Sequence, residues 1–392
     1  MERLNAFVQN YHWGDTSFIA TLQGRQATEK PEAELWIGTH QKSPSMILGT
    51  PNTLAETINS DPEQTLGVHV HQTFGELPYL LKILAINTPL SLQVHPTAAQ
   101  AQAGFNQENT NQIPLTSPNR IFTTADEKSE IVCALTPFEA VFGFRRLSES
   151  MSRISQISHP DLDDFITQLN QRGTDTERLQ AVVGWLFAQP SEKIKTLIRA
   201  VEENSRQVPV GSSPELKSFA KLAAVYPDDP VVMICLLLNH VTLQAGDALY
   251  VPPGTVHAYL GGYAVEITSN SDNVIRAGLT TKPVNPDSFC SIVDFTPIDP
   301  KIQTSDSSQK AYNSYGAAFS LSRLDLDGEW TTSLDGPEIL ISTEGPFTIT
   351  NSQQESLQIN QGTPVWVPYS DLHYTLSGKA LVFRGAVIQP KK

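Results

Sequence analysis

Long apolar runs, paired cysteines and an excess of basic charge are all missing from this sequence of 392 residues. The longest apolar run, Val231 to Leu238, is far shorter than the roughly 20 residues of a membrane-spanning helix. The three cysteines have no CxxC spacing, so we expect no disulfide framework. A formal net charge of −14 argues against the clustered basic surface that binds nucleic acid. We therefore expect neither a membrane nor a nucleic-acid partner.

The remaining composition is that of a folded protein. Hydrophobic residues make up 40% of the chain and charged residues 17%, which is ordinary for globular proteins and argues against disorder. The N-terminal stretch MERLNAFVQNYHWGD lacks a basic segment followed by an apolar core, so no secretory signal is visible and we expect a cytoplasmic protein. At roughly 150 residues per domain, the length predicts two or three domains.

The pattern of apolar residues changes along the chain. Short strand-like runs such as AELWIGTH and PYLLKILAI fill residues 1–144, which is typical of a sandwich or barrel. Residues 148–226 instead carry apolar residues at helical spacing. Strand character returns with PVVMICLLL, so we expect a buried strand at Val231 to Leu238, and the polar, Pro- and Ser-rich residues 296–316 read as a connector.

A G-x(4)-V-P-x(4)-H pattern occurs twice. The first copy runs from Gly246 to His257 and the second from Gly362 to His373, both in strand-rich segments. The repeat predicts two related β-barrels with a helical insertion. The predicted division is a first barrel of residues 1–146 and 228–295, a helical domain of residues 147–227 and a second barrel of residues 296–392.

Two strand-like segments each present a row of polar side chains. Because alternate residues of a strand share a face, Ser91, Gln93 and His95 point one way in SLQVHP. The same period places Lys128 and Glu130 together in DEKSEIV. Polar rows that face the inside of a barrel need partners, because unpaired buried polar groups are costly.

A third polar row completes a set of metal-ligand types. His257 and Tyr259 share a face just after a Pro-Pro-Gly turn. Gln93, His95, Glu130 and His257 together supply two imidazoles, one carboxylate and one amide oxygen. Such a set of nitrogen and oxygen ligands suits zinc, or a similar divalent ion, at an open catalytic site. We expect one zinc ion per chain.

Several blocks resemble a known family. LPYLLKILAINTPLSLQVHP, DEKSEIVCALTPFEAVFGFR, GDALYVPPGTVHAYL and SDNVIRAGLTTKPVN are similar to signature blocks of type I mannose-6-phosphate isomerases. YHWGD and AELWIGTH resemble the N-terminal blocks, and all lie in family order from Tyr11 to Asn285. The resemblance implies a mainly β fold with two cupin-like jelly-roll barrels. It also implies a zinc-dependent aldose–ketose isomerase that interconverts mannose 6-phosphate and fructose 6-phosphate through an enediolate.

The resemblance also implies roles for particular residues. The family's metal ligands fall on Gln93, His95, Glu130 and His257, and its catalytic arginine falls on Arg276. Other active-site positions of the family fall on Lys128, Tyr259, Glu266, Asp272 and Lys282. Either Lys128 or Glu266 is the base that moves the proton between C1 and C2. Lys82, Ser91 and Lys282 are candidates for the phosphate end, and Trp13 for the wall of the sugar pocket.

One departure from the family pattern leaves alternatives open. Glu127 stands where the family usually has a histidine proposed to help open the sugar ring. Two rival interpretations of the function therefore stay open. One is another metal-dependent cupin enzyme, and the other is a cupin that binds a sugar phosphate without turnover. We expect a monomer whose partner is a small sugar phosphate.

Overall fold

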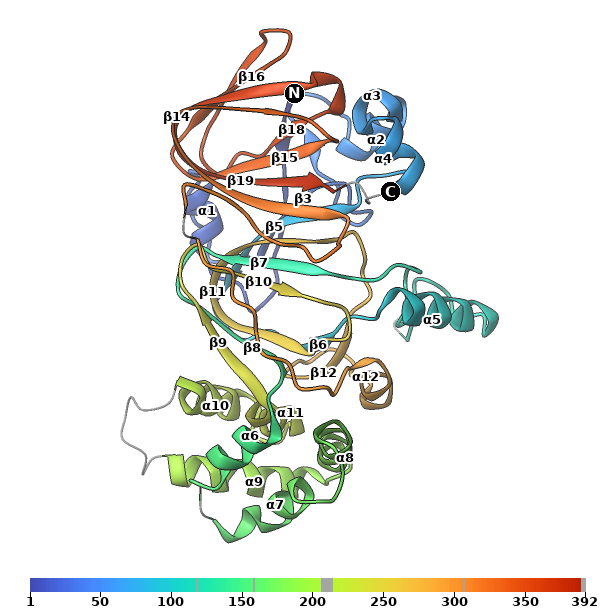
Figure 1. Ribbon diagram of the computed structural model, residues 1–392, viewed down its shortest axis with the longest axis vertical. Helices are drawn as coiled ribbons and strands as arrows, with labels where there is room; N and C mark the ends of the chain where they lie inside the picture. The colour runs from blue at the N-terminus through green and yellow to red at the C-terminus, as the bar shows by residue number, and fades with distance from the viewer. Residues whose placement is uncertain (118, 158, 206–213, 306, 389–392) are drawn as a thin grey trace.

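Two antiparallel β-sheets and a helical lobe build the molecule (Figure 1). The computed structural model describes residues 1–117, 119–157, 159–205, 214–305 and 307–388. The helical lobe lies at one end, a ten-stranded sheet lies in the middle, and a nine-stranded sheet lies at the other end. The predicted mainly β fold with a helical insertion is confirmed. None of the described helices is long and apolar enough to cross a membrane.

The ten-stranded sheet contains the predicted polar rows. Its main path is β10 (Ala248–Val251), β7 (Glu130–Ala134), β11 (His257–Ser269), β5 (Tyr79–Ile86), β3 (Glu34–Ile37) and β2 (Phe7–Gln9). The strands off this path are β6 (Leu92–Val94), β8 (Phe138–Phe144), β9 (Leu238–Leu243) and β12 (Ile275–Gly278). β6 pairs with both β11 and β12, which brings three of the chain's conspicuous motifs side by side.

Strand alternation decides which side chains face the inside of this sheet. On β5, Leu81 and Ile83 join a hydrophobic cluster that also contains Phe383 of the other sheet. The residues that alternate with them, Lys82 and Leu84, turn to the opposite side and line a cavity. Packing between the two sheets therefore fixes the apolar face of β5. Because alternate residues point to opposite faces, the same packing directs Lys82 into the cavity.

The nine-stranded sheet uses both ends of the chain. Its main path is β13 (Gln309–Ala311), β14 (Phe319–Ser333), β19 (His373–Val387), β15 (Glu338–Glu344), β18 (Val365–Val367), β1 (Glu2–Asn5) and β4 (Met46–Ile47). β16 (Phe347–Asn351) pairs with β19, and β17 (Ser356–Ile359) pairs with β16. The N-terminal strand β1 thus lies in the same sheet as the C-terminal strands, although the proposed domain division assigns it to the first barrel.

The two copies of the sequence repeat share a glycine turn followed by a short strand and a long strand. Gly246 and Gly362 have φ values of +90° and +71°, a conformation that glycine adopts without steric cost. Each glycine is followed by a short strand, β10 or β18. His257 and His373 then begin the two long strands β11 and β19.

Residues 1–144 contain helices that the strand-like pattern did not predict. They are α1 (Phe18–Leu22), α2 (Leu54–Ser60), α3 (Pro62–Leu66), α4 (Val68–Phe74) and α5 (Ala98–Thr110). Two of them begin with capping boxes, in which Thr53 pairs with Glu56 and Thr97 with Gln100. The Thr-x-x-Glu/Gln spacing is a local signal for a helix start that the apolar pattern alone does not contain.

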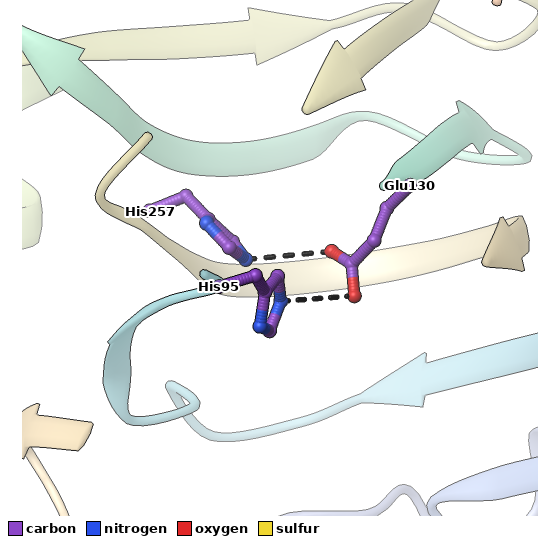
Figure 2. A group of neighbouring side chains, drawn as sticks. All are labelled: His95, Glu130 and His257. Carbon is purple, nitrogen blue, oxygen red and sulfur yellow. Dashed lines mark ion pairs between the residues drawn. The ribbon is translucent and has the colours of Figure 1, made fainter. Parts of the chain in front are cut away.

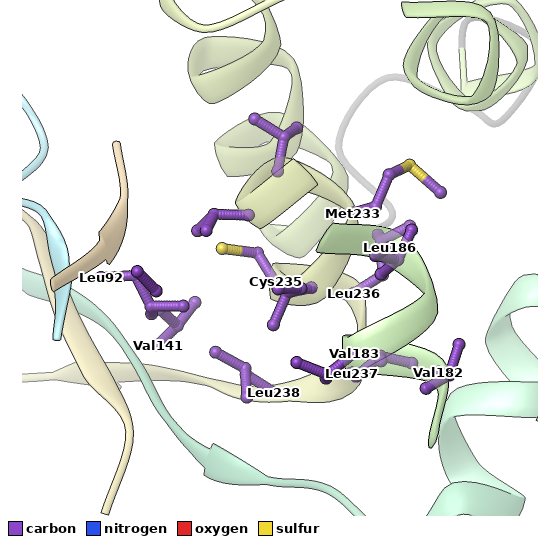
Figure 3. Packing of buried hydrophobic residues seen from close by; sticks show 14 of the residues in the cluster. Leu92, Val141, Val182, Val183, Leu186, Met233, Cys235, Leu236, Leu237 and Leu238 are labelled. Atoms are coloured by element: carbon purple, nitrogen blue, oxygen red, sulfur yellow. The ribbon is translucent and has the colours of Figure 1, made fainter. Parts of the chain in front are cut away.

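The helical lobe extends further than predicted. Its helices are α6 (Leu147–Ile154), η1 (Pro160–Leu162), α7 (Asp163–Leu169), α8 (Asp175–Phe187), α9 (Ser191–Ser205), α10 (Pro214–Val225), α11 (Pro230–Ile234) and η2 (Cys235–Leu237). The predicted strand at Val231–Leu238 is wrong, because only Leu238 belongs to a strand. The Asp229 side chain caps α11 and Pro230 occupies its first turn. Residues 231–238 pack in the core of the lobe (Figure 3). A short helix that is buried on all sides shows no polar face that would distinguish it from a strand.

A further helix, α12 (Pro286–Ile292), lies outside the lobe's sequence and follows β12.

A buried ion pair fastens the lobe to the ten-stranded sheet. Arg145, at the end of β8, places Nη2 2.6 Å from Oε1 of Glu215 on α10 and also donates to the Leu238 carbonyl. The other carboxylate oxygen pairs with Arg153 of α6. The Arg145 side chain is 3% exposed and that of Glu215 is 11% exposed.

Replacing Glu215 by alanine is expected to destabilise the protein by about 3–5 kcal/mol, because Arg145 would remain as a buried charge without its carboxylate. Asp299→Ala is the matched control, since it removes the acidic partner of the neighbouring Arg146, and both side chains of that pair are exposed. We expect it to change stability by about 0–1 kcal/mol. Urea denaturation of both variants measures the difference, and equal midpoints would contradict the anchoring role.

Candidate active site

Three side chains from distant parts of the chain meet inside the ten-stranded sheet (Figure 2). His95 follows β6, Glu130 begins β7 and His257 begins β11. His95 Nε2 lies 3.2 Å from Glu130 Oε1, and His257 Nε2 lies 3.4 Å from Glu130 Oε2. All three side chains are at most 2% exposed. Their possible ligand atoms lie within 4.8 Å of one another, so the cluster can hold one metal ion.

Backbone carbonyls fix which nitrogen of each imidazole faces the cluster. His95 Nδ1 lies 3.0 Å from the Asn273 carbonyl oxygen, and His257 Nδ1 lies 2.9 Å from that of Thr255. Because a carbonyl only accepts, both Nδ1 atoms donate, and the neutral rings carry their lone pairs on Nε2. Two lone pairs that face one carboxylate repel it unless a cation lies between them. The tautomers therefore fit a metal site.

The protonation state of His95 fits the same conclusion. Burial, followed by the nearby Lys128 ammonium, lowers the pKa of His95 to about 4. The ring is then neutral at physiological pH, as a metal-binding imidazole must be. Its buried Nε2 makes no hydrogen bond within the described part of the chain. A nitrogen and oxygen donor set of this kind suits zinc.

Gln93 lies at the edge of the cluster. It stands opposite His257 in the register of β6 with β11, and its side-chain Nε2 lies 3.4 Å from His257 Nε2. A flip of the amide exchanges Nε2 for Oε1, which is the atom that a metal would take. Gln93 therefore lies next to the His257 end of the cluster.

Two further polar side chains surround Glu130. Lys128 Nζ lies 2.9 Å from Glu130 Oε1, and the Tyr259 hydroxyl donates to Oε2 at 3.3 Å. Burial alone would raise the pKa of Glu130, but the nearby Lys128 ammonium holds it well below its usual range. Burial and the Glu130 charge raise the pKa of Tyr259 well above its ordinary value. Glu130 is thus a carboxylate and Tyr259 a hydrogen-bond donor.

A buried lysine and two carboxylates form a second polar group. Lys82 and Glu266 are direct partners in the register of β5 with β11, with Lys82 Nζ 3.0 Å from Glu266 Oε2 and 4.0 Å from Glu34 Oε2. Burial would lower the pKa of Lys82, but the two carboxylates raise it. Burial is also the main cause that raises the pKa of Glu266.

A cavity of about 320 Å3 opens above the cluster. It has space for a small polar molecule. His95 and His257 are not among its lining residues. The predicted site residues that line it are Trp13, Lys82, Ser91, Gln93, Lys128, Glu130, Tyr259, Glu266, Asp272, Arg276 and Lys282.

Two cations of the cavity are not neutralised by carboxylates. Arg276 is the register partner of Gln93 on β12, which places it beside the cluster, and Lys282 Nζ lies 4.9 Å from the centre of the Tyr11 ring. Burial lowers the pKa of Arg276. Burial, followed by the Arg276 charge, lowers the pKa of Lys282. Within the described ranges, neither side chain makes an ion pair, so this side of the cavity favours an anion.

Three lining residues were not predicted from the sequence. His40 Nε2 and Lys42 Nζ bind the two oxygens of Asp272 at 3.1 Å and 2.6 Å. Burial would raise the pKa of Asp272, but these contacts hold it well below its usual value. Glu34 accepts from the Trp36 indole. All three lie in the AELWIGTH block or within two residues of its end, so the block was a signal even though the individual residues were not singled out.

Asn273 is a further residue that sequence reasoning missed. It is fully buried, its carbonyl orients His95, and its side-chain oxygen accepts from the Thr123 amide at 2.8 Å. Its side-chain nitrogen donates to the carbonyls of Thr124 and Asp126, each at 2.9 Å. The side chain thus holds the segment that leads into the Lys128 loop. Glu127 itself is not among the residues that line the cavity.

A buried cluster of potential metal ligands beside a polar, partly cationic cavity is the kind of site that a metal-dependent enzyme of small anionic molecules has. The family model "Phosphomannose isomerase type I, catalytic domain" matches residues 1–147. Mannose-6-phosphate isomerase of Escherichia coli is 34% identical to this chain. The alignment covers 98% of this chain and 99% of that enzyme. The human enzyme is 29% identical, with 98% of both chains aligned.

Solved structures give the same result. Apo mannose 6-phosphate isomerase from Salmonella typhimurium has a TM-score of 0.89, 30% identity and 99% coverage of both chains. A mannose 6-phosphate isomerase bound with zinc and yttrium has the same TM-score, identity and coverage. The chain belongs to the mannose-6-phosphate isomerase family.

His257→Ala is expected to lose most of its bound zinc, because one of the two imidazoles of the cluster is removed. His373→Ala is the matched control, since His373 occupies the equivalent place in the sequence repeat and is exposed. Metal analysis after dialysis against free zinc measures both variants. A full zinc content in His257→Ala would contradict the assignment of His257 as a ligand.

Proposed function

We propose that this chain interconverts mannose 6-phosphate and fructose 6-phosphate with one zinc ion held by Gln93, His95, Glu130 and His257. The observation that carries the proposal is the pair of Nε2 lone pairs that face a buried carboxylate at the bottom of a cavity. Family membership supplies the reaction, and the cavity supplies a place for its substrate. When bound, zinc supplies a Lewis acid that stabilises negative charge developing on the sugar oxygens.

The charges in the cavity divide it into two ends. Lys82 and Lys128 are paired with buried carboxylates, whereas Arg276 and Lys282 are not. We assign the phosphate to Lys282 with Ser91 at the mouth, because an unpaired cation there gains most from a dianion. Arg276 stands beside Gln93 and binds the sugar oxygen whose charge grows in the enediolate.

We assign proton transfer between C2 and C1 to Glu266. Lys82 donates to its Oε2, which leaves Oε1 as the acceptor, and a carboxylate with a raised pKa is a stronger base. Lys128 already donates to Glu130 and therefore acts as a hydrogen-bond donor to the substrate. Asp272, held by His40 and Lys42, accepts from sugar hydroxyls.

One chain contains the entire proposed site. The four ligands and all the described lining residues of the cavity belong to a single protomer, which supports function as a monomer. Cys133 and Cys235 are buried and unpaired, and Cys290 is half-buried and unpaired. Free thiols of this kind support a reducing, cytoplasmic compartment.

Removal of the metal is expected to abolish the isomerase activity, and zinc alone is expected to restore it. A coupled assay with mannose 6-phosphate follows turnover before chelator treatment, after it, and after zinc is added back. Activity that survives complete zinc removal would contradict the metal-dependent mechanism. Binding of mannose 6-phosphate without turnover in the zinc-loaded protein would show an inactive sugar-phosphate-binding protein instead.

Arg276→Ala and Lys282→Ala are expected to affect different kinetic constants. Arg276→Ala should lower kcat by about 100-fold or more with little change in KM, because the charge it meets develops in the transition state. Lys282→Ala should raise KM with kcat largely kept, because the phosphate charge is the same throughout the reaction. Steady-state kinetics separates the two, and an unchanged kcat in Arg276→Ala would make Arg276 a binding residue.

A further inference from the structure

One segment of the active-site cavity is tied to the helical lobe. β12 ends at Gly278, and Leu279, Thr280 and Lys282 directly beyond it all line the cavity above the metal-ligand cluster. Helix α11 of the lobe lies against β12. We call residues 279–282 the Lys282 turn. The position of this turn decides where the Lys282 ammonium stands in the cavity.

Asp229 links the lobe to the Lys282 turn. It is the N-cap residue of α11, and its Oδ1 accepts from the Val231 amide at 2.9 Å. Its Oδ2 accepts from the Leu279 amide at 2.6 Å. One half-buried carboxylate thus caps a helix of the lobe and also holds the first residue of the turn. Asp229 itself is not among the described residues that line the cavity.

The backbone conformation of Leu279 needs such support. Its φ is +57°, in the left-handed region that residues other than Gly, Asn and Asp rarely adopt. A conformation of this kind persists where the surrounding structure holds it through several contacts. The Leu279 side chain is 1% exposed and belongs to the same hydrophobic cluster as Val231 and Val232 of α11. Both its amide and its side chain are therefore held by the lobe.

The lack of a side chain at Gly278 allows this contact. A Cβ added at Gly278 would lie 2.5 Å from Asp229 Oδ1 and 2.6 Å from Oδ2, well inside van der Waals contact. Gly278 has no positive φ, so the need for glycine is one of space and not of backbone conformation. The carboxylate reaches the Leu279 amide through the space that the glycine leaves.

The contact acts on Lys282 more than on Arg276. Arg276 lies within β12, where the pairing with β6 fixes its backbone. Lys282 lies beyond the strand, where its amide donates to the Thr280 hydroxyl at 3.1 Å and its Nζ lies 4.9 Å from the centre of the Tyr11 ring. The first contact lies within the turn, and the second is at the end of a flexible side chain. Neither fixes the turn against the sheet, so this role falls to Asp229.

We propose that Asp229 is a positioning residue for the phosphate end of the active site. Its carboxylate holds the Lys282 turn in the place where the ammonium meets the substrate phosphate, although Asp229 itself lies outside the cavity. The helical lobe thereby takes part in substrate binding. The inference rests on the proposed function, in which Lys282 binds the phosphate.

The test compares Asp229→Ser with Asp228→Asn in the zinc-loaded protein. Serine can still cap α11, but its shorter side chain cannot keep both contacts. We expect Asp229→Ser to raise KM for mannose 6-phosphate by about tenfold and to keep kcat within about twofold. Asp228→Asn removes the charge of the exposed neighbour, which accepts from the Ser191 hydroxyl, and should leave KM unchanged. Thermal melting checks that each variant is folded at the assay temperature.

Two further variants and a readout without turnover test the route. Gly278→Ala should also raise KM, because its methyl group displaces the Asp229 carboxylate without any change of charge. In a Lys282→Ala background, Asp229→Ser should change KM by less than about twofold, because residues that act as a unit are not additive. Hydrogen exchange of the peptide that contains Leu279 should be faster in Asp229→Ser than in the wild type.

Several results would overturn the inference. They are an unchanged KM in Asp229→Ser, a lower kcat at constant KM, and an effect that adds fully to that of Lys282→Ala. Unchanged hydrogen exchange at Leu279 would overturn it whatever the kinetics. Failure of the proposed function looks different: the wild type would not turn over mannose 6-phosphate, or Lys282→Ala would leave KM unchanged. Faster exchange in Asp229→Ser would still show then that Asp229 holds the turn.

Discussion

The arrangement of two imidazole lone pairs around one buried carboxylate is the constraint on which the functional part of the structure depends. The carbonyls of Asn273 and Thr255 hold the Nδ1–H groups, so both Nε2 atoms must face Glu130. Without a cation between them this arrangement is repulsive, and a fold that builds it from three distant segments needs a metal to stabilise it. The polar residues nearby are organised around the same point.

The period of the strands explains how an apolar sheet can carry so many charges. Lys82 and Glu266 face each other across β5 and β11, while their neighbours Leu81 and Ile267 pack between the two sheets. A shift of register by one residue would bury the charges in that apolar layer and expose the leucines to the cavity. The contact between the sheets, although distant from the chemistry, therefore fixes the register of the active site.

Much of this could be predicted from the sequence, for identifiable reasons. Strand alternation and the family blocks pointed to the residues of the metal cluster, because those residues lie on regular strands or directly beside them. The strand predicted at Val231–Leu238 failed, since a helix buried on all sides has no polar face to reveal its period. His40 was missed because only the tertiary fold brings the segment after β3 to Asp272.

The two sheets neutralise their buried charges in different ways. In the ten-stranded sheet, Lys82 and Lys128 are matched by buried carboxylates, so the cations that remain for a ligand lie at one side of the cavity. In the nine-stranded sheet, Glu338 neutralises Arg384. The repeat reproduces the turn and the long strand in both sheets, but only the first copy has an imidazole buried beside a carboxylate. The second copy places its histidine in solvent. The same backbone plan therefore places a histidine among candidate metal ligands in one sheet and in solvent in the other.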